Sequence, residues 1–167
     1  MLRRVCNVAT TVLIVLILSL AALFTVPQWI GYLPYTVLSG SMEPSYPVGS
    51  IVFVSRAAPE EVQVNDVIMF TLADGTLVTH RVVDILPEEQ AFVTKGDANN
   101  AADFTPVPFE NMVGKAKFCI PLLGFLAVFL KTGIGMTVFC IVLASLILVE
   151  FLPQFIKGRK EAAKAPQ

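Results

Sequence analysis

Val67-Ile-Met-Phe-Thr-Leu-Ala-Asp-Gly-Thr-Leu-Val-Thr-His-Arg-Val-Val-Asp-Ile-Leu86 contains two runs rich in β-branched and aromatic residues, joined by Asp74-Gly75. Such runs are typical of strands, and Asp-Gly is a preferred dipeptide of two-residue type I′ hairpin loops. The stretch therefore predicts two antiparallel strands. If Asp74 and Gly75 form the loop, His80 lies opposite Met69.

Further runs of the same kind lie on both sides of this hairpin, separated by segments that contain proline or glycine. They are residues 51–54, 91–94 and 112–118. Because no convincing helical period interrupts them, the sequence predicts a mainly β fold, with a small antiparallel β domain over residues 35–118.

Two uncharged apolar runs flank this domain. At 1.5 Å per residue, residues 5–26 reach about 33 Å as a helix, enough to cross a hydrocarbon layer of roughly 30 Å. Residues 132–149 are just long enough to do the same. The chain is 55% hydrophobic and 15% charged, which argues against a wholly soluble protein. We therefore expect a transmembrane helix on each side of the β domain.

The 12 basic and 13 acidic residues nearly cancel, but they occupy different parts of the chain. Residues 35–112 hold 11 carboxylates and three bases, whereas Arg3 and Arg4 precede the first apolar run and basic residues follow the second. The positive-inside tendency then predicts a multi-pass plasma membrane protein with both termini in the cytoplasm and an outer β domain. The balance also argues against nucleic-acid binding.

The predicted organisation has five parts. They are the cytoplasmic N-terminus with the first transmembrane helix (1–34), the extracytoplasmic β domain (35–118), an interfacial membrane segment (119–131), the second transmembrane helix (132–152) and a basic cytoplasmic tail (153–167). The third part is apolar but too short to span a bilayer, and Pro121 and Gly124 interrupt it. We expect Lys115, Lys117 and Lys131 to lie at lipid headgroups.

A cleavable secretory signal is the alternative interpretation of the first apolar run. The run is longer than the apolar region of such signals, and the aromatic residues Trp29 and Tyr32 follow it instead of small ones. We therefore expect an uncleaved anchor.

The β domain offers few groups for catalysis. The cysteines Cys6, Cys119 and Cys140 all lie in or beside apolar stretches, so we expect no thiol catalysis, no Cys/His metal site and no cofactor there. Ser41 follows Gly40, which permits a sharp turn, and is a candidate nucleophile. A plain linker is the more common role of a Ser-Gly-Ser tripeptide.

The only histidine in the chain, His80, is a candidate general base for a serine. It shares a strand face with Val78 and Val82, so a partly buried structural histidine is the alternative. Asp97 and Asp103, within the polar stretch 95–103, are candidates for orienting the imidazole. A surface loop rich in turn-forming residues is the alternative there.

Taken together, a series of segments resembles type I signal peptidases. They are Ser39-Gly-Ser-Met-Glu-Pro44, Val48-Gly-Ser-Ile-Val52, Asn65-Asp-Val-Ile-Met-Phe70, Thr79-His-Arg-Val-Val83 and Thr94-Lys-Gly-Asp-Ala-Asn-Asn-Ala-Ala-Asp103. The resemblance covers residues 36–118 and is to the endoplasmic-reticulum type, which also occurs in archaea and some Gram-positive bacteria. The commoner bacterial type has a lysine at the position of His80. Asn65 and Ala98 depart from the family pattern.

The resemblance implies a serine endopeptidase that removes signal peptides from secreted preproteins. The implied functional residues are the nucleophile Ser41, the base His80, the orienting Asp103, the supporting Asp97, and the Ser41 amide with the Ser39 hydroxyl as oxyanion donors. Candidates for lining shallow pockets that accept small residues before the cut are Val37, Leu38, Ile51 and Val52.

Two alternatives stay open beside a Ser/His peptidase. One is a Ser/Lys peptidase that uses Lys95, and the other is a membrane-anchored assembly subunit without catalysis. An imidazole base predicts that kcat/KM falls in acid, since a protonated ring cannot accept the serine proton. The expected partners are preproteins and the lipid bilayer. A chain with two spans of its own is expected to act alone, although the sequence does not decide whether other subunits take part.

Overall fold

The computed structural model describes residues 2–162, and Met1 and residues 163–167 of the predicted tail lie outside the described residues. The helices are α1 (Leu2–Trp29), α2 (Leu123–Lys131) and α3 (Gly133–Ala162), with short 3-10 helices at Pro59–Glu61 and Phe109–Asn111. The strands are β1 (Tyr32–Thr36), β2 (Ile51–Ser55), β3 (Val67–Thr71), β4 (Leu77–Leu86), β5 (Ala91–Lys95), β6 (Val107–Pro108) and β7 (Met112–Ile120).

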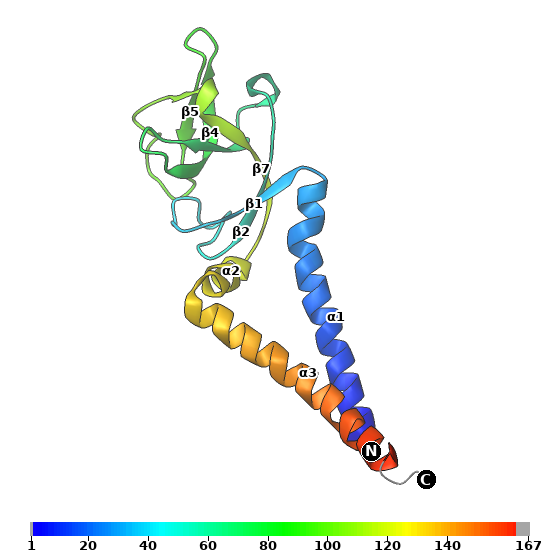
Figure 1. Ribbon diagram of the computed structural model, residues 1–167. Coiled ribbons are helices and arrows are strands. Elements are labelled where there is room, and N and C mark those ends of the chain that lie inside the picture. Colours follow the sequence, from blue (N-terminus) through cyan, green and yellow to red (C-terminus); the bar gives the residue numbers. More distant parts are fainter. Residues whose placement is uncertain (1, 163–167) are drawn as a thin grey trace. The chain divides into compact units, whose positions relative to one another are not determined.

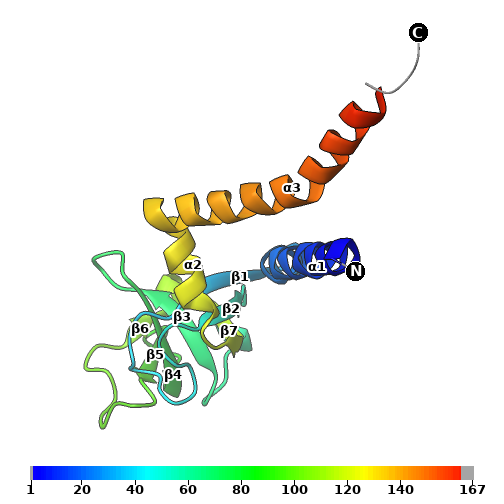
Figure 2. The ribbon, with the colours of Figure 1, turned by 90° about the horizontal axis from the view of Figure 1, so that it is seen from below.

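The chain divides into two compact units. One is Phe24–Val128, which contains all of these strands (Figure 1), and the other combines Met1–Leu23 with Phe129–Gln167. The strands form one sheet in the order β1-β2-β7-β3-β4-β5-β6, in which all neighbouring pairs are antiparallel (Figure 2). The expectation of a mainly antiparallel β domain is therefore confirmed.

β3 and β4 form the predicted hairpin, but the predicted register is wrong by one residue. Ile68, and not Met69, lies opposite His80. Directly opposed residues of an antiparallel pair project from the same face of the sheet. His80 therefore lies on the face of the fully buried Ile68.

The shift arises because the hairpin loop has three residues instead of two. The amide of Leu72 donates to the carbonyl of Thr76, which leaves Ala73, Asp74 and Gly75 as the loop. Gly75, at φ 84, adopts the left-handed conformation that commonly closes a three-residue loop. The dipeptide signal located the turn but not its length.

Two clusters of buried side chains stabilise the sheet, and β3 contributes to both because alternate residues face opposite sides. The first cluster comprises Val62, Ile68, Phe70, Val82, Phe92 and Val107. The second comprises Val52, Val54 and Met69. The site-bearing strand β4 is held on the first cluster by Val82, which is completely buried.

Two strands were not predicted, β1 and β6. Pro34 lies within β1 and Pro108 within β6, and a proline weakens the strand signal of a short segment. Both strands form edges of the sheet, where a proline does not remove a ladder hydrogen bond from a central strand.

The end of the β unit differs in detail from the prediction. β7 continues to Ile120, and Cys119 pairs with Val52. The remainder of the predicted interfacial segment is largely the helix α2. The ammonium group of Lys115 is engaged within the β unit, where it pairs with Asp66 and donates to the Glu61 carbonyl at 3.0 Å.

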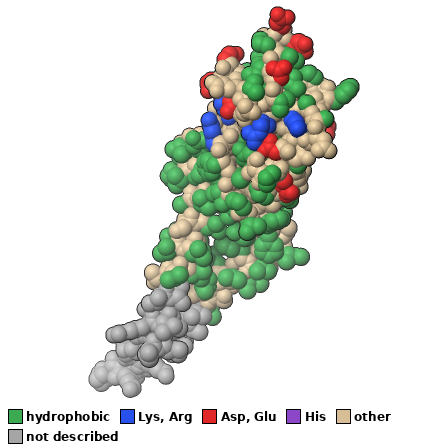
Figure 3. Space-filling view, turned by 180° about the vertical axis from the view of Figure 1, so that it is seen from behind, with side chains coloured by type: hydrophobic (Ala, Val, Ile, Leu, Met, Phe, Trp, Pro, Cys, Tyr) green, Lys and Arg blue, Asp and Glu red, His purple; other side chains and the backbone are tan. Residues whose placement is uncertain are grey.

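Acidic side chains are spread over the β unit, as the distribution of charges predicts. Figure 3 shows several of them on one face, with Lys and Arg side chains grouped nearby.

Residues 11–29 of α1 are long and apolar enough to cross a membrane, with a mean hydropathy of 2.2. α2 and residues 133–148 of α3 meet the same criterion only if they are counted together as one bent span.

Candidate active site

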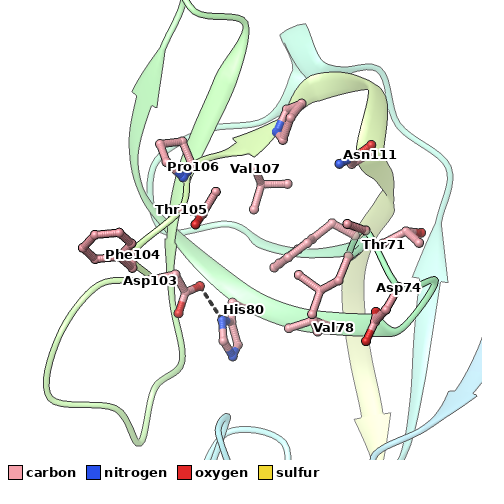
Figure 4. A pocket seen from close by; sticks show the side chains of 14 residues that line it. Thr71, Asp74, Val78, His80, Asp103, Phe104, Thr105, Pro106, Val107 and Asn111 are labelled. Carbon is pink, nitrogen blue, oxygen red and sulfur yellow. Dashed lines mark hydrogen bonds and ion pairs between the residues drawn. The ribbon is translucent and has the colours of Figure 1, made fainter.

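His80 and Asp103 form a close pair. His80 projects from β4 and is 8% exposed, and Asp103 lies in the loop before β6. Nδ1 of His80 is 2.6 Å from Oδ2 of Asp103, and Figure 4 shows the two side chains directed toward one another. The ring of Phe70 meets the imidazole edge-on at a centroid distance of 6.1 Å. The short distance is that of a charge-assisted hydrogen bond.

This contact determines which nitrogen of His80 carries the proton in the neutral ring. An ionised carboxylate can only accept hydrogen bonds, so Nδ1 donates to Asp103. Nε2 is then left with a lone pair. Figure 4 shows this second nitrogen pointing away from Asp103. The arrangement is the one that a general base requires.

Ser41 lies in the turn that follows β1. The turn is closed by a hydrogen bond from the Glu43 amide to the Gly40 carbonyl at 3.0 Å. The Ser41 carbonyl accepts a hydrogen bond from the Ala98 amide at 2.9 Å. A Cβ atom on Gly96 would lie 2.6 Å from that carbonyl oxygen, so glycine is required for this close approach. The turn is thus anchored on the loop that ends at Asp103.

The hydroxyl of Ser41 is 3.4 Å from that of Ser39, which is longer than an ordinary hydrogen bond between hydroxyls. Among the described residues, no hydrogen bond joins Ser41 to His80. Catalytic hydrogen bonds are often absent or long in a free enzyme and tighten when substrate binds.

Asp97 has a different hydrogen-bond partner from Asp103. It binds the guanidinium of Arg81 through both carboxylate oxygens, at 2.8 Å to Nε and 2.7 Å to Nη2. The hydrogen bonds from Arg81, aided by one from Ser45, hold the pKa of Asp97 below its usual value although burial opposes this. Because Ser45 belongs to the segment after Ser41, Asp97 supports the site by joining that segment to β4.

We predict that Asp97→Asn lowers the free energy of unfolding by about 2 kcal/mol at neutral pH, since a charge-assisted pair is lost. The depressed pKa of Asp97 means that its contribution is present above the ordinary aspartate pKa and disappears as the pH falls through the folded value. The difference from wild type should therefore shrink below about pH 4. Denaturant unfolding of the detergent-solubilised chain measures this. The exposed Asp84→Asn is the control, and equal stability of the two variants would contradict the prediction.

One cavity of about 460 Å³ contains Ser39 and Ser41 in its wall. Three of the four predicted pocket residues line it, namely Val37, Leu38 and Val52. Ile51 does not, because neighbouring residues of a strand face opposite sides of the sheet. The apolar side chains of this wall suit small apolar side chains of a substrate.

A second cavity, of about 720 Å³, adjoins the His80–Asp103 pair and is shown in Figure 4. Its wall includes the apolar side chains of Phe70, Val78 and Val107. Apolar surroundings lower the local dielectric constant and strengthen a hydrogen bond between charged groups. This cavity thus contributes to the environment of the pair.

The sequence did not reveal three contacts of the site. These are the bidentate Arg81–Asp97 pair, the close approach of Gly96 to Ser41, and a hydrogen bond from the Thr94 hydroxyl to Asp103. Arg81 follows His80 directly, Thr94 precedes the polar stretch 95–103 and Gly96 lies within it, so nearness in the sequence was the only signal that could have indicated these contacts.

Comparison with known proteins shows a family match. Residues 7–85 match the family model described as signal peptidase, peptidase S26. The matched region contains Ser41 and His80 and ends before Asp97 and Asp103.

Individual relatives agree with this match. Signal peptidase I W of Bacillus subtilis is 46% identical over 89 residues, which are 52% of this chain and 47% of that protein. The signal peptidase complex catalytic subunit SEC11 of Zygosaccharomyces rouxii is 32% identical over 108 residues, 57% of this chain and 64% of that protein. Human SEC11C is 25% identical over 106 residues, 57% of this chain and 55% of that protein. The chain thus spans less than two thirds of the length of these relatives.

Proposed function

We propose that the chain, of which residues 7–85 match the signal peptidase family model, is a membrane-bound serine endopeptidase that cleaves signal peptides from secreted preproteins. The observation that carries the proposal is the His80–Asp103 pair, which leaves one imidazole nitrogen free to act as a base. The loop that supplies Asp103 also holds the Ser41 carbonyl, so a nucleophile and its base are supported by one segment.

In the proposed reaction, Nε2 of His80 accepts the proton of Ser41 while Oγ attacks the scissile carbonyl carbon. The resulting oxyanion accepts hydrogen bonds from the Ser41 amide and the Ser39 hydroxyl, and one such donor is worth about 3 kcal/mol. The carbon–nitrogen bond then breaks, and the imidazolium returns the proton to the leaving amine. His80 next activates a water molecule that hydrolyses the acyl-enzyme. Asp103 stabilises the imidazolium both during formation of the acyl-enzyme and during its hydrolysis.

The cavity beside Ser41 supports the proposed specificity for small residues before the cut. Val37, Leu38 and Val52 provide apolar walls, and Ser41 lies in the same wall. A substrate side chain that fills this cavity would bring its carbonyl group to Oγ. Ile51 has no such contact and is not part of the proposed pocket.

We also propose the membrane arrangement that the charges predict. The chain is a multi-pass plasma membrane protein with both termini in the cytoplasm, and the β unit lies on the extracytoplasmic side. Only residues 30–40 separate α1 from Ser41, which keeps the site within reach of the outer leaflet. The basic residues before the first apolar run and after the second support this orientation.

The proposal is tested with the purified full chain in lipid vesicles and one labelled preprotein. Cleavage directly after the signal peptide is expected without any added protein, and mass spectrometry of the product defines the cut. The SEC11 relatives are named as catalytic subunits of a complex, whereas we propose that this chain acts alone. An inert wild-type chain would contradict the proposal and favour an assembly subunit.

Lys95→Ala is expected to leave turnover unchanged, which separates the Ser/His enzyme from a Ser/Lys enzyme. Lys95 ends β5 opposite Arg81 and is not in the wall of the cavity that contains Ser41. A lysine base would instead make this variant lose activity by orders of magnitude. Single-turnover cleavage is the measurement, with the exposed Lys117→Ala as the matched control. Loss of activity in the Lys95 variant alone would support the lysine base.

A further inference from the structure

Thr94 holds Asp103 at two points. Thr94 lies on β5 and is fully buried, with 0% exposure. Its hydroxyl donates to Oδ2 of Asp103 at 2.6 Å, and its main-chain carbonyl accepts from the Asp103 amide at 2.8 Å. One residue therefore fixes both the backbone and the carboxylate of Asp103.

The hydroxyl of Thr94 and the imidazole of His80 share one acceptor atom. Oδ2 of Asp103 is 2.6 Å from Oγ1 of Thr94 and 2.6 Å from Nδ1 of His80. Since an ionised carboxylate has no proton to give, both groups donate to it. Two donors on one oxygen keep the negative charge there and oppose rotation of the carboxylate away from the ring. The β-branched side chain of Thr94 is itself stiff about χ1, which makes it a firm support.

The pairing of β4 with β5 explains how Thr94 reaches this position. Thr94 lies opposite Val82, which is two residues from His80 and on the same face of β4. A threonine hydroxyl with a purely structural role commonly bonds to a nearby backbone carbonyl. Here it bonds to the carboxylate that orients the base.

We propose that Thr94 is a positioning residue that keeps the proton of neutral His80 on Nδ1 and so leaves Nε2 free to accept the Ser41 proton. This inference rests on the proposed function and adds a member to the same site. Without the hydroxyl, Asp103 can turn away from the ring. His80 then also populates the tautomer with the proton on Nε2, which cannot act as a base.

Thr94→Val tests this with little change in side-chain volume. We expect kcat for preprotein cleavage to fall about tenfold to a hundredfold, the usual effect of losing a hydrogen bond to a charged group. KM should stay unchanged, because Thr94 lines neither of the two cavities described above. Thr94→Ser retains the hydroxyl and should restore most of the lost activity. Thr137→Val is the matched control, because the Thr137 hydroxyl donates only to the Gly133 carbonyl within α3.

A spectroscopic readout follows from the fact that His80 is the only histidine in the chain. With ¹⁵N-labelled histidine, the imidazole signals of the detergent-solubilised full chain report on this residue alone. The wild type, Thr94→Ser and Thr137→Val should show a proton on Nδ1, and Thr94→Val should show a mixture of the two tautomers.

These outcomes separate the two proposals. Wild-type kcat together with an unmixed Nδ1 tautomer in Thr94→Val would overturn the positioning role. A loss of activity that appears in KM and that Thr94→Ser does not rescue would indicate a structural role and would also overturn it. A wild-type chain without peptidase activity would refute the proposed function, and the tautomer comparison would still decide the role of Thr94.

Discussion

Ser41→Ala is expected to abolish preprotein cleavage, with kcat reduced on the order of 10⁴-fold or more, as for other serine peptidases without their nucleophile. Alanine removes only the oxygen that attacks the scissile carbonyl. The Ser41 hydroxyl lies 3.4 Å from that of Ser39, which is a weak contact, so little stability depends on it. The contacts that place the turn involve the main chain and remain intact, including the Ser41 carbonyl bonded to Ala98.

The measurement is single-turnover cleavage by the variant in lipid vesicles, with sedimentation to show that the protein remains in the membrane. Ser55→Ala, at the end of β2, is the matched control and should retain wild-type turnover. If Ser41→Ala cleaved at the wild-type rate, Ser41 could not be the nucleophile, and the proposed mechanism would be wrong.

His80→Ala is expected to lose activity by a similar factor, because Ser41 would have no base to accept its proton. Residues that act as one catalytic unit show non-additive effects. The double variant Ser41→Ala/His80→Ala should therefore be no less active than either single variant. The comparison of the three proteins in one assay measures this coupling directly.

Loss of the imidazole also removes one of the two donors to Asp103, so the alanine variant is expected to be less stable than wild type. His80→Gln provides a second test, since an amide can still donate to the carboxylate but cannot serve as a base. Both variants should be inactive, and only the alanine variant should show the larger loss of stability. Substantial cleavage by both would point to a different base, for which Lys95 is the candidate.

The strands of the central hairpin could be predicted because their signals are local. β-branched and aromatic runs between breakers identify β3 and β4 whatever the rest of the chain does. The register could not be predicted, since it depends on whether Gly75 closes a two-residue or a three-residue loop. β1 and β6 were missed because Pro34 and Pro108 are tolerated only at sheet edges, and the sequence does not show which strands are edges.

The candidate site was only partly predictable. Ser41 and His80 stand out as residue types, since the predicted β domain, residues 35–118, contains no cysteine and the chain has only one histidine. Asp97 and Asp103 have the same chemistry and lie six positions apart in one loop, so residue type alone could not separate them, and only the family resemblance implied the orienting role for Asp103. In the structure, Asp103 is hydrogen-bonded to His80 and Asp97 to Arg81.

The amino-acid sequence alone was sufficient for properties that depend on local pattern: the apolar run of α1, the acidic middle of the chain, the β character of residues 51–118 and the choice of candidate reactive side chains. The three-dimensional fold was needed to show which atoms meet. The shared contact of Thr94 and His80 on Asp103 arises from strand pairing and a returning loop. Hydrogen bonds act over about 3 Å, and only long-range packing brings distant residues within that distance.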